Sequence, residues 1–244
     1  MRPFSKIAPY YETLMDGVPY PMWLAYLKLI WAKLDRAPRT VLEVCCGTGR
    51  MCRMLAEEGF SLTGVDLSRP MIREASRLAK EACLRVRYEV QDAAELDLGE
   101  RFDAAFSFFD SLNNITDPGR LAKALRRVRD HLAPGGPFLF DLNTDYAFKH
   151  KMFDQKDRNR RRRVRYEWRS RWDPESRLCT IEMDFWTKEG EFREVHVQRA
   201  YSVEEIEAMM QDAGFRRVET FDAYTLDPPR GRSDRIHVLG VAPE

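Results

Sequence analysis

The 244-residue sequence lacks the features that mark disulfide-stabilised, zinc-binding and membrane-spanning proteins. Its five cysteines are odd in number, and none has the paired Cys-x-x-Cys or Cys/His spacing of a zinc site. We therefore expect buried, reduced thiols and no metal. No apolar run approaches the ~20 residues of a membrane span, and residues 1–16, interrupted by Arg2, Lys6 and Glu12, lack the apolar core of a signal peptide. These absences predict a cytoplasmic protein.

An excess of charge of one sign is also missing, because 40 Lys and Arg residues balance 39 Asp and Glu residues. The net charge of +1 gives no overall attraction to nucleic acid or to an anionic membrane, although local patches leave nucleic acid open as a partner. No internal repeat or long low-complexity linker divides the chain. With 44% apolar residues, this length is enough for one α/β domain plus an elaboration.

The most informative stretch is VLEVCCGTG at residues 41–49, followed by GVD at residues 64–66. An apolar strand leads into a glycine turn and a helix, and a second apolar strand ends in Asp66, which is the layout of a nucleotide-binding βαβ unit. Gly47 and Gly49 let the backbone approach a ligand and adopt positive φ. Asp66 can accept two hydrogen bonds from a ribose diol. The ligand is therefore expected to carry an adenosine, as a dinucleotide or as S-adenosylmethionine.

Two details favour S-adenosylmethionine. The dinucleotide pattern requires a third small residue three places after Gly49, where this chain has Cys52. Glu43 lies inside the first strand, where a carboxylate cannot usefully face a pyrophosphate but can support a turn that cradles an ammonium group. S-adenosylmethionine has an amino acid tail and no phosphate, so we expect it as the cofactor.

From these residues onward the chain resembles the class I S-adenosylmethionine-dependent methyltransferases. Asp92 stands where that family places an acid against the adenine amino group, with Ala93 beside it. Residues 102–114 resemble the family's fourth strand and the loop after it, and residues 131–143 are similar to its "LkPGG" turn into the fifth strand. Residues 10–23 and 196–201 further resemble a bacterial subgroup of small-molecule methyltransferases. Four motifs in the family's order cover residues 40–143.

The resemblance implies a Rossmann-like, doubly wound, seven-stranded sheet that is mostly parallel with an antiparallel last strand. The hydrophobic pattern predicts the same alternation. Strands are expected at residues 40–45, 60–66, 85–90, 103–109, 137–142, 216–222 and 235–242. Helices are expected at residues 19–34, 50–58, 69–82 and 118–132, with Ser68 and Asp117 as caps, and a last helix begins at a Ser202 to Glu205 capping box.

Between these elements, residues 163–172, 179–187 and 192–199 alternate with period two, which predicts a three-stranded antiparallel insertion. Its route passes over the carboxyl edge of the sheet, so it is well placed to be a lid. We expect an N-terminal helical cap at residues 1–34 and a cofactor-binding domain formed by residues 35–145 and 201–244. The lid occupies residues 146–200.

The resemblance also implies which residues bind the cofactor. Cys45 stands where the family often has glycine, and we expect reduced room there rather than lost binding. Tyr10 and Tyr11 precede the first helix and either fold over the cofactor's amino acid end or pack as interface aromatics of the cap. The expected cofactor contacts are Tyr11, Glu43, Cys45, Gly47, Thr48, Gly49, Asp66, Leu67, Met71, Asp92, Ala93 and Phe109.

Phe109 and Asp110 follow the fourth strand and should face the cleft beside the reacting methyl group. In the last insertion strand, Glu194, His196 and Gln198 share one face. If that face looks into the cleft, His196 is a candidate general base; otherwise the face is solvated. The catalytic candidates are thus His196 and Asp110, and the substrate-binding candidates are Tyr10, Asn113, Glu194 and Arg199.

These features predict an enzyme that transfers a methyl group to a nitrogen or oxygen atom of a small molecule by in-line displacement. Residues 158–165 hold six arginines, which suggests the alternative of an RNA methyltransferase or, more simply, a solvated loop. A second alternative is a protein that binds S-adenosylmethionine without catalysis, because no obligatory catalytic signature is present. The methyl acceptor and the oligomeric state are not encoded in any of these patterns.

Overall fold

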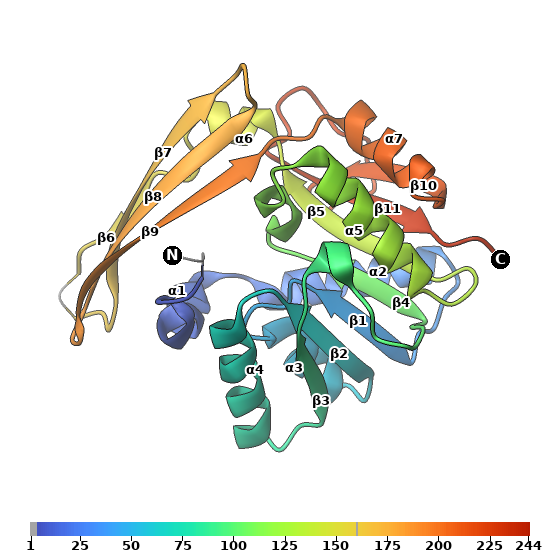
Figure 1. Cartoon of the computed structure of the whole chain (residues 1–244), viewed down its shortest axis with the longest axis horizontal. Coiled ribbons are helices and arrows are strands. Elements are labelled where there is room, and N and C mark those ends of the chain that lie inside the picture. Colours follow the sequence, from blue (N-terminus) through green and yellow to red (C-terminus); the bar gives the residue numbers. More distant parts are fainter. Residues whose placement is uncertain (1–3, 160) are drawn as a thin grey trace.

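The structure is a computed structural model that describes residues 4–159 and 161–244. A seven-stranded sheet is covered by helices on both faces, and a four-stranded antiparallel sheet stands beside the carboxyl ends of its parallel strands (Figure 1). In spatial order the large sheet consists of β3 (Val86–Val90), β2 (Ser61–Asp66), β1 (Thr40–Val44), β4 (Ala104–Ser107), β5 (Pro137–Asn143), β11 (Arg235–Val241) and β10 (Arg216–Asp222).

The strand directions confirm the expected architecture. β1 to β5 are parallel, and β11 lies antiparallel between β5 and β10. One face packs against α2 (Tyr20–Lys33), α3 (Arg50–Glu57) and α4 (Arg69–Glu81), and the other packs against α5 (Pro118–Asp130) and α7 (Val203–Asp212). Two buried apolar clusters, one on each face, therefore fix the sheet as the centre of the fold.

Short helical segments surround this centre. The chain begins with η1 (Ala8–Tyr10), α1 (Tyr11–Leu14) and η2 (Met15–Gly17), which precede α2. Three others follow strand ends or precede the lid: η3 (Ala93–Glu95), η4 (Ser111–Asn114) and α6 (Asp145–Lys149). None of these was expected as a separate helix, because three to five residues are too few to show a helical period.

The caps read from the sequence are present. Ser68, Asp117 and Ser202 each accept a hydrogen bond from the backbone N–H three residues later, at 3.4, 2.7 and 3.1 Å. The capping box is only half formed, because the carboxylate of Glu205 binds Arg199 at 2.7 Å, whereas a full box needs it on the backbone N–H of Ser202. The helix start was predictable from local sequence, and the competing ion pair was not.

The insertion has four strands and not the three expected: β6 (Gln155–Asp157), β7 (Arg165–Asp173), β8 (Leu178–Thr187) and β9 (Gly190–Arg199). β6 was missed because it is three residues long and entirely polar. Inward-facing residues of β8 alternate with outward ones and join an apolar cluster with the N-terminal segment; they are Cys179, Ile181, Met183 and Phe185.

The expectation for β4 was also too long. The strand ends at Ser107, and Phe109 and Asp110 both have left-handed backbone, with φ of +64° and +49°. An apolar run cannot reveal this turn, because Phe108 and Phe109 have the side chains of a strand.

The five cysteines are free, but the expectation that all are buried is wrong for Cys83, which is exposed at the end of α4. Cys46, Cys52 and Cys179 are buried. No helix among the described residues has the length and apolar character needed to cross a membrane. Within the same residues, no cluster of His, Cys, Asp or Glu side chains has the geometry of a metal site.

The two glycines of the turn after β1 have different physical roles. Gly47 has φ of +54°, and a Cβ there would meet nothing within 4 Å. Gly49 has φ of +69°, but a Cβ there would lie 2.3 Å from the hydroxyl oxygen of Tyr88. Gly49 therefore makes room for Tyr88 under the turn, a role that the sequence pattern did not predict. Cys45 has φ of +59°, so the family's preferred glycine there reflects backbone conformation.

Gly49→Ala and Gly47→Ala should separate these roles. Both variants place a side chain in left-handed backbone, at about 1–2 kcal/mol each. Gly49→Ala adds the collision with Tyr88, about 1–3 kcal/mol more, so its free energy of unfolding should fall further in urea denaturation without cofactor. Gly47→Ala should lose cofactor affinity instead. Equal losses of stability in the two variants would contradict the role assigned to Tyr88.

Candidate functional site

The candidate site lies at the carboxyl ends of β1, β2 and β4, where open α/β sheets bind ligands. A cavity of about 30 Å³ opens there between the glycine turn, the N-terminal segment and the turn after β4. Its lining includes Tyr11, Tyr20, Glu43, Gly47, Phe109 and Ser111.

Asp66 ends β2 and holds two turns at once. One carboxylate oxygen accepts from the backbone N–H of Gly47 at 2.9 Å, and the other accepts from Ser68 at 2.7 Å. Burial raises the pKa of Asp66, although these two hydrogen bonds favour its ionised form. Leu67, directly after it, is 54% exposed despite its apolar side chain. An acid beside an uncovered apolar side chain suits a ribose with its flat base.

Asp92 and Ala93 lie at the end of the next strand, and Ala93 is buried. One oxygen of Asp92 accepts from the backbone N–H of Ala94 at 2.9 Å. The other lies 2.5 Å from the guanidinium of Arg120 in an exposed ion pair. A ligand amino group that binds Asp92 therefore competes with Arg120, a partner that the sequence motif did not predict.

Glu43 is buried below the glycine turn and lines the cavity. One of its oxygens accepts from the backbone N–H of Cys52 at 2.9 Å, so this acid supports the first turn of α3. Burial raises the pKa of Glu43 to about 7, because the low-dielectric surroundings disfavour the ionised form. Glu43 therefore changes between its neutral and its ionised form near neutral pH.

The N-terminal segment closes over this turn. Glu12 accepts from the hydroxyl of Thr48 at 2.5 Å and pairs with Arg53 at 3.0 Å. Tyr11 lines the cavity, and burial, together with the nearby Tyr20, raises its pKa well above the ordinary value. Tyr11 is therefore part of the wall of the cleft. Met71, another expected cofactor contact, is fully buried against the N-terminal segment.

Glu194 and His196 hold the start of the chain. The Glu194 carboxylate accepts from the backbone N–H groups of Phe4, Lys6 and Ile7 at 2.8, 2.9 and 3.1 Å. The Nε2–H of His196 donates to the same carboxylate at 2.9 Å, and its ring lies 4.2 Å from that of Phe4. The polar face of β9 is buried, as one sequence interpretation required, but these two side chains face the N-terminal segment.

Tyr10, Asn113 and Arg199, the other expected substrate contacts, all have protein partners. The hydroxyl of Tyr10 donates to Glu189 at 2.7 Å. The amide nitrogen of Asn113 donates to the backbone oxygens of Asn143 and Arg199 at 3.1 and 2.8 Å. Arg199 binds Glu205, as described above. These three side chains fasten the lid to the rest of the molecule.

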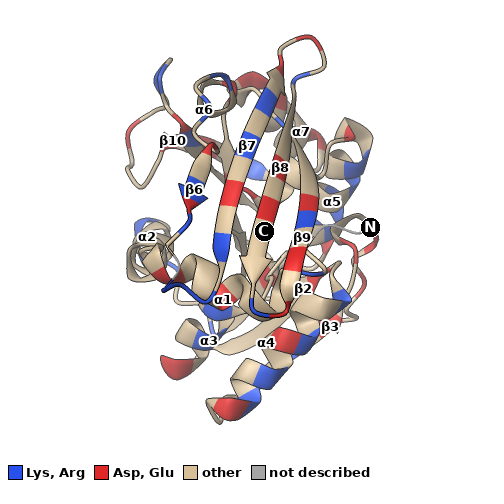
Figure 2. Ribbon diagram, turned by 90° about the vertical axis from the view of Figure 1, so that its left-hand side faces the viewer, with Lys and Arg blue, Asp and Glu red and all other residues tan. Residues whose placement is uncertain are grey.

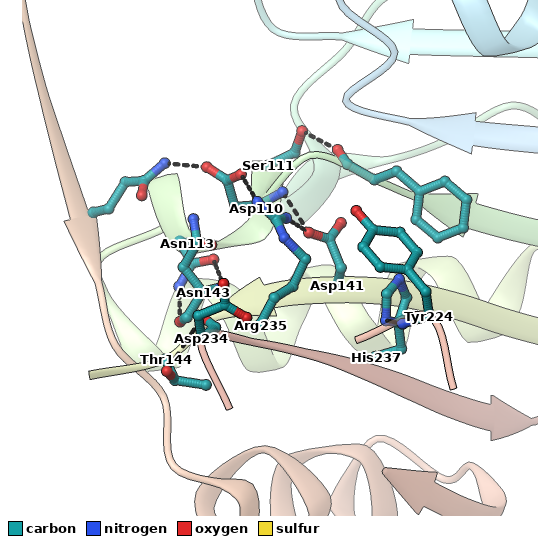
Figure 3. Close-up of polar contacts among 12 residues, drawn as sticks. Asp110, Ser111, Asn113, Asp141, Asn143, Thr144, Tyr224, Asp234, Arg235 and His237 are labelled. Atoms are coloured by element: carbon teal, nitrogen blue, oxygen red, sulfur yellow. Dashed lines mark hydrogen bonds and ion pairs between the residues drawn. The ribbon is translucent and has the colours of Figure 1, made fainter. Parts of the chain in front are cut away.

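Asp110 lies at the centre of a buried polar network that joins four parts of the chain (Figure 3). Its carboxylate accepts from Gln198 of the lid at 2.7 Å and from Arg235 of β11 at 3.0 Å. Its backbone N–H donates to Asp141 at 2.9 Å, and Arg235 also pairs with Asp141. Sequence reasoning placed Gln198 on the polar face of its strand without assigning it a role, and it missed Asp141 and Arg235. Only Asp141 gave a signal, as a single acid inside the apolar run FLFDL.

An aromatic wall adjoins Asp110 on the α2 face of the sheet. The Phe109 ring lies 4.3 Å from that of Trp23 and 4.8 Å from that of Tyr20. Tyr224 and the fully buried His237 extend the wall, with ring centroids 5.1 Å apart. Burial, with a contribution from the nearby arginine, lowers the pKa of His237 to about 3, so this ring is neutral at physiological pH.

The arginine run at residues 158–165 lies at the entry to β7, and Arg160 is outside the described residues. Arg158 pairs with Glu167, and Arg162 lies 3.4 Å from Asp157. Acidic and basic residues are mixed on the outward face of β7, β8 and β9 (Figure 2), where Asp184 of β8 pairs with Arg169 and Arg193 of its neighbours. The acidic partners interrupt the basic surface, so a long phosphate backbone would meet both signs of charge.

Known proteins give the family. Residues 41–136 match the methyltransferase domain family. Over 239 residues the chain is 28% identical to YqeM of Bacillus subtilis, whose name assigns it to the methyltransferases, covering 96% of this chain and 94% of that one. A crystal structure of an S-adenosylmethionine-dependent methyltransferase from Clostridium acetobutylicum has a TM-score of 0.86 at 26% identity and covers 98% of both chains. The chain belongs to the class I S-adenosylmethionine-dependent methyltransferases.

Weaker likenesses show the fold alone. The sugar N-methyltransferase KedS8 from a Streptoalloteichus species has a TM-score of 0.78 at 23% identity, with 95% of this chain and 91% of that one covered.

The cofactor of the family to which the present chain belongs is S-adenosylmethionine, and the residues of this chain fit it. Gly47 leaves its ligand side open, Leu67 is uncovered beside Asp66, and Glu43 provides an acid where the cofactor's ammonium group is expected.

Cofactor affinity should depend on pH through Glu43. As pH rises through about 7, Glu43 loses its proton, and its carboxylate attracts the ammonium group of S-adenosylmethionine. The α-amino group itself loses charge near pH 8. Calorimetry should therefore give an affinity about fivefold higher at pH 7.5 than at pH 6, declining above pH 8. Glu43→Gln should keep only the decline, and a rise that persists in this variant would exclude Glu43 as its cause.

Glu194→Gln should loosen the N-terminal segment. Burial alone would raise the pKa of Glu194, but hydrogen bonds from His196, Ile7 and Phe4 outweigh burial and lower it. The charged clamp is therefore complete above pH 4.5 or so and is lost as pH falls further. At neutral pH, trypsin should cleave after Lys6 roughly tenfold faster in this variant, because charged hydrogen bonds are weakened. Glu191→Gln, on the outward face of the same strand, is the control and should match the wild type.

Proposed function

We propose that this methyltransferase transfers the methyl group of S-adenosylmethionine to a nitrogen atom of a small molecule, with oxygen as the alternative acceptor atom. The state of three candidate bases, Asp110, His196 and His237, carries this proposal; Glu43, which also lines the cavity, is assigned to the cofactor side. Both oxygens of Asp110 have cationic or amide partners, His196 is bonded to Glu194, and His237, with a pKa of about 3, is a poor base. A neutral amine needs no base for attack, whereas a hydroxyl benefits from one.

The proposed cofactor contacts follow the order of the strands. Asp66 accepts from the ribose hydroxyls, and Leu67 covers one face of the adenine, for which its exposed side chain is suited. Asp92 accepts a hydrogen bond from the adenine amino group once the ion pair between Asp92 and Arg120 has opened. Glu43 and the ligand-facing side of Gly47 receive the amino acid tail.

The sulfonium of the bound cofactor supplies an activated methyl group. The protein's task is alignment, because the attacking lone pair must lie about 3 Å from the methyl carbon on the S–C axis. Phe109 and Tyr20, which both line the cavity, offer flat faces that orient the acceptor and exclude water. Tyr11, which lines the cavity, is proposed to cover the reacting end. Asp110 shapes this wall from behind and is not proposed as the base.

Two further observations favour a small acceptor. The lid is fastened to the N-terminal segment by Glu194 and Tyr10, an arrangement that suits a small acceptor held beneath both segments better than a polymer. The name of KedS8 gives a sugar nitrogen as the acceptor of a protein with the same fold. The RNA alternative has less support, because acidic residues interrupt the arginine surface.

Incubation with methyl-labelled S-adenosylmethionine and a bacterial metabolite extract tests the proposal. Label should enter small molecules, and acetylation of the extract's amines beforehand should remove the signal. Asp66→Ala should weaken cofactor binding by about 1–3 kcal/mol and so reduce transfer about 5- to 150-fold at subsaturating cofactor, while Asp130→Ala at the exposed end of α5 should be unaffected. Label insensitive to acetylation would favour an oxygen acceptor. Label in RNA, or cofactor binding without transfer, would favour the alternatives.

A further inference from the structure

The lid touches the wall of the cleft through one buried side chain. Gln198 lies near the end of β9, is 5% exposed, and donates through its amide nitrogen to Asp110 at 2.7 Å. Its amide oxygen has no partner among the residues that the structure describes. The two residues are 88 positions apart in sequence, so this hydrogen bond exists only when the lid is docked.

Asp110 in turn holds a strained turn. Phe109 and Asp110 are consecutive non-glycine residues in left-handed backbone, a conformation that costs about 1–2 kcal/mol per residue. Such a turn persists only where its surroundings hold it in place. Three bonds to Asp110 do so here: from Gln198 and from Arg235 to its carboxylate, and from its backbone N–H to Asp141 (Figure 3).

The turn decides where Phe109 points. Its ring lines the cavity and packs on Trp23 at 4.3 Å, so a change of backbone at Phe109 and Asp110 would remove the ring from the wall. Arg235, which lies 5.2 Å above the Trp23 ring, touches the same wall from the other side. An unbroken series of contacts therefore connects the lid, the turn and the aromatic wall.

We propose that Gln198 and Arg235 are positioning residues that act through Asp110 to hold Phe109 in the wall of the methyl-acceptor site. Docking of the lid adds the Gln198 bond and completes the hold on the turn; withdrawal of the lid removes it and lets the turn relax. The acceptor site is thus fully shaped only when the lid is closed. This inference rests on the proposed function for the meaning of the wall, but the coupling itself is independent of catalysis.

An exchange of partners tests the bond directly. Gln198→Glu places two carboxylates face to face and should raise the hydrogen-exchange rates of the Asp110 and Asn113 amides about tenfold. Asp110→Asn should be mild, because the unpartnered oxygen of Gln198 can turn to accept from the new amide. In the double variant the introduced amide donates to the introduced carboxylate and still accepts from Arg235. The exchange rates should therefore return toward those of the wild type.

A second measurement separates positioning from general loosening of the fold. Gln198→Glu should weaken S-adenosylmethionine binding about threefold to tenfold in calorimetry and change Trp23 fluorescence, with both effects rescued in the double variant. Val195→Gln, on the exposed face of β9, should change neither. The proposal is overturned if the amide hydrogen-exchange rates in Gln198→Glu equal those of the wild type. It is also overturned if the double variant exchanges as fast as Gln198→Glu. Failure of the wild type to bind the cofactor would instead refute the proposed function, and the exchange test would still stand.

Discussion

The two hydrogen bonds that Asp66 accepts from Gly47 and Ser68 are the interaction on which the rest of the site depends. They join the end of β2 to the glycine turn after β1 and to the start of α4, so three elements meet at one carboxylate. Parallel strands end at a common edge and leave their following turns without ladder partners. A buried acid at this edge satisfies two such turns and keeps its remaining lone pairs for a ligand.

Around this point the site is assembled from segments far apart in the chain. Glu12 ties the N-terminal segment to the glycine turn, and Glu194 ties the same segment to the lid. Asp110 then ties the lid to β5 and β11. Each tie is a carboxylate with several donors, and such charge-assisted hydrogen bonds are stronger than neutral ones. Closure of the cleft therefore depends on three acids that sequence reasoning assigned partly to catalysis and substrate binding.

This arrangement explains why the methyltransferase offers no obvious base. Two titratable side chains near the cleft form hydrogen bonds that hold it closed. His196 is bonded to Glu194, and Asp110 is bonded to Gln198 and Arg235. Positioning and exclusion of water remain as the protein's contributions, and both suit an acceptor that is already nucleophilic. Glu43, with its raised pKa, is the exception, because we propose that it lies on the cofactor side and couples cofactor binding to pH.

Local patterns determined most of the fold. The seven strands, the helices with caps at Ser68 and Asp117, and the glycine turn with its downstream Asp66 follow from hydrophobic period and short-range hydrogen bonding, which are encoded within a few neighbouring residues. Tertiary structure alone decided the rest. The role of Gly49 is set by Tyr88, the direction of His196 by Phe4, and the left-handed turn at Phe109 by Gln198 and Arg235. Those partners come together only when distant segments pack, and a linear pattern contains no record of that packing.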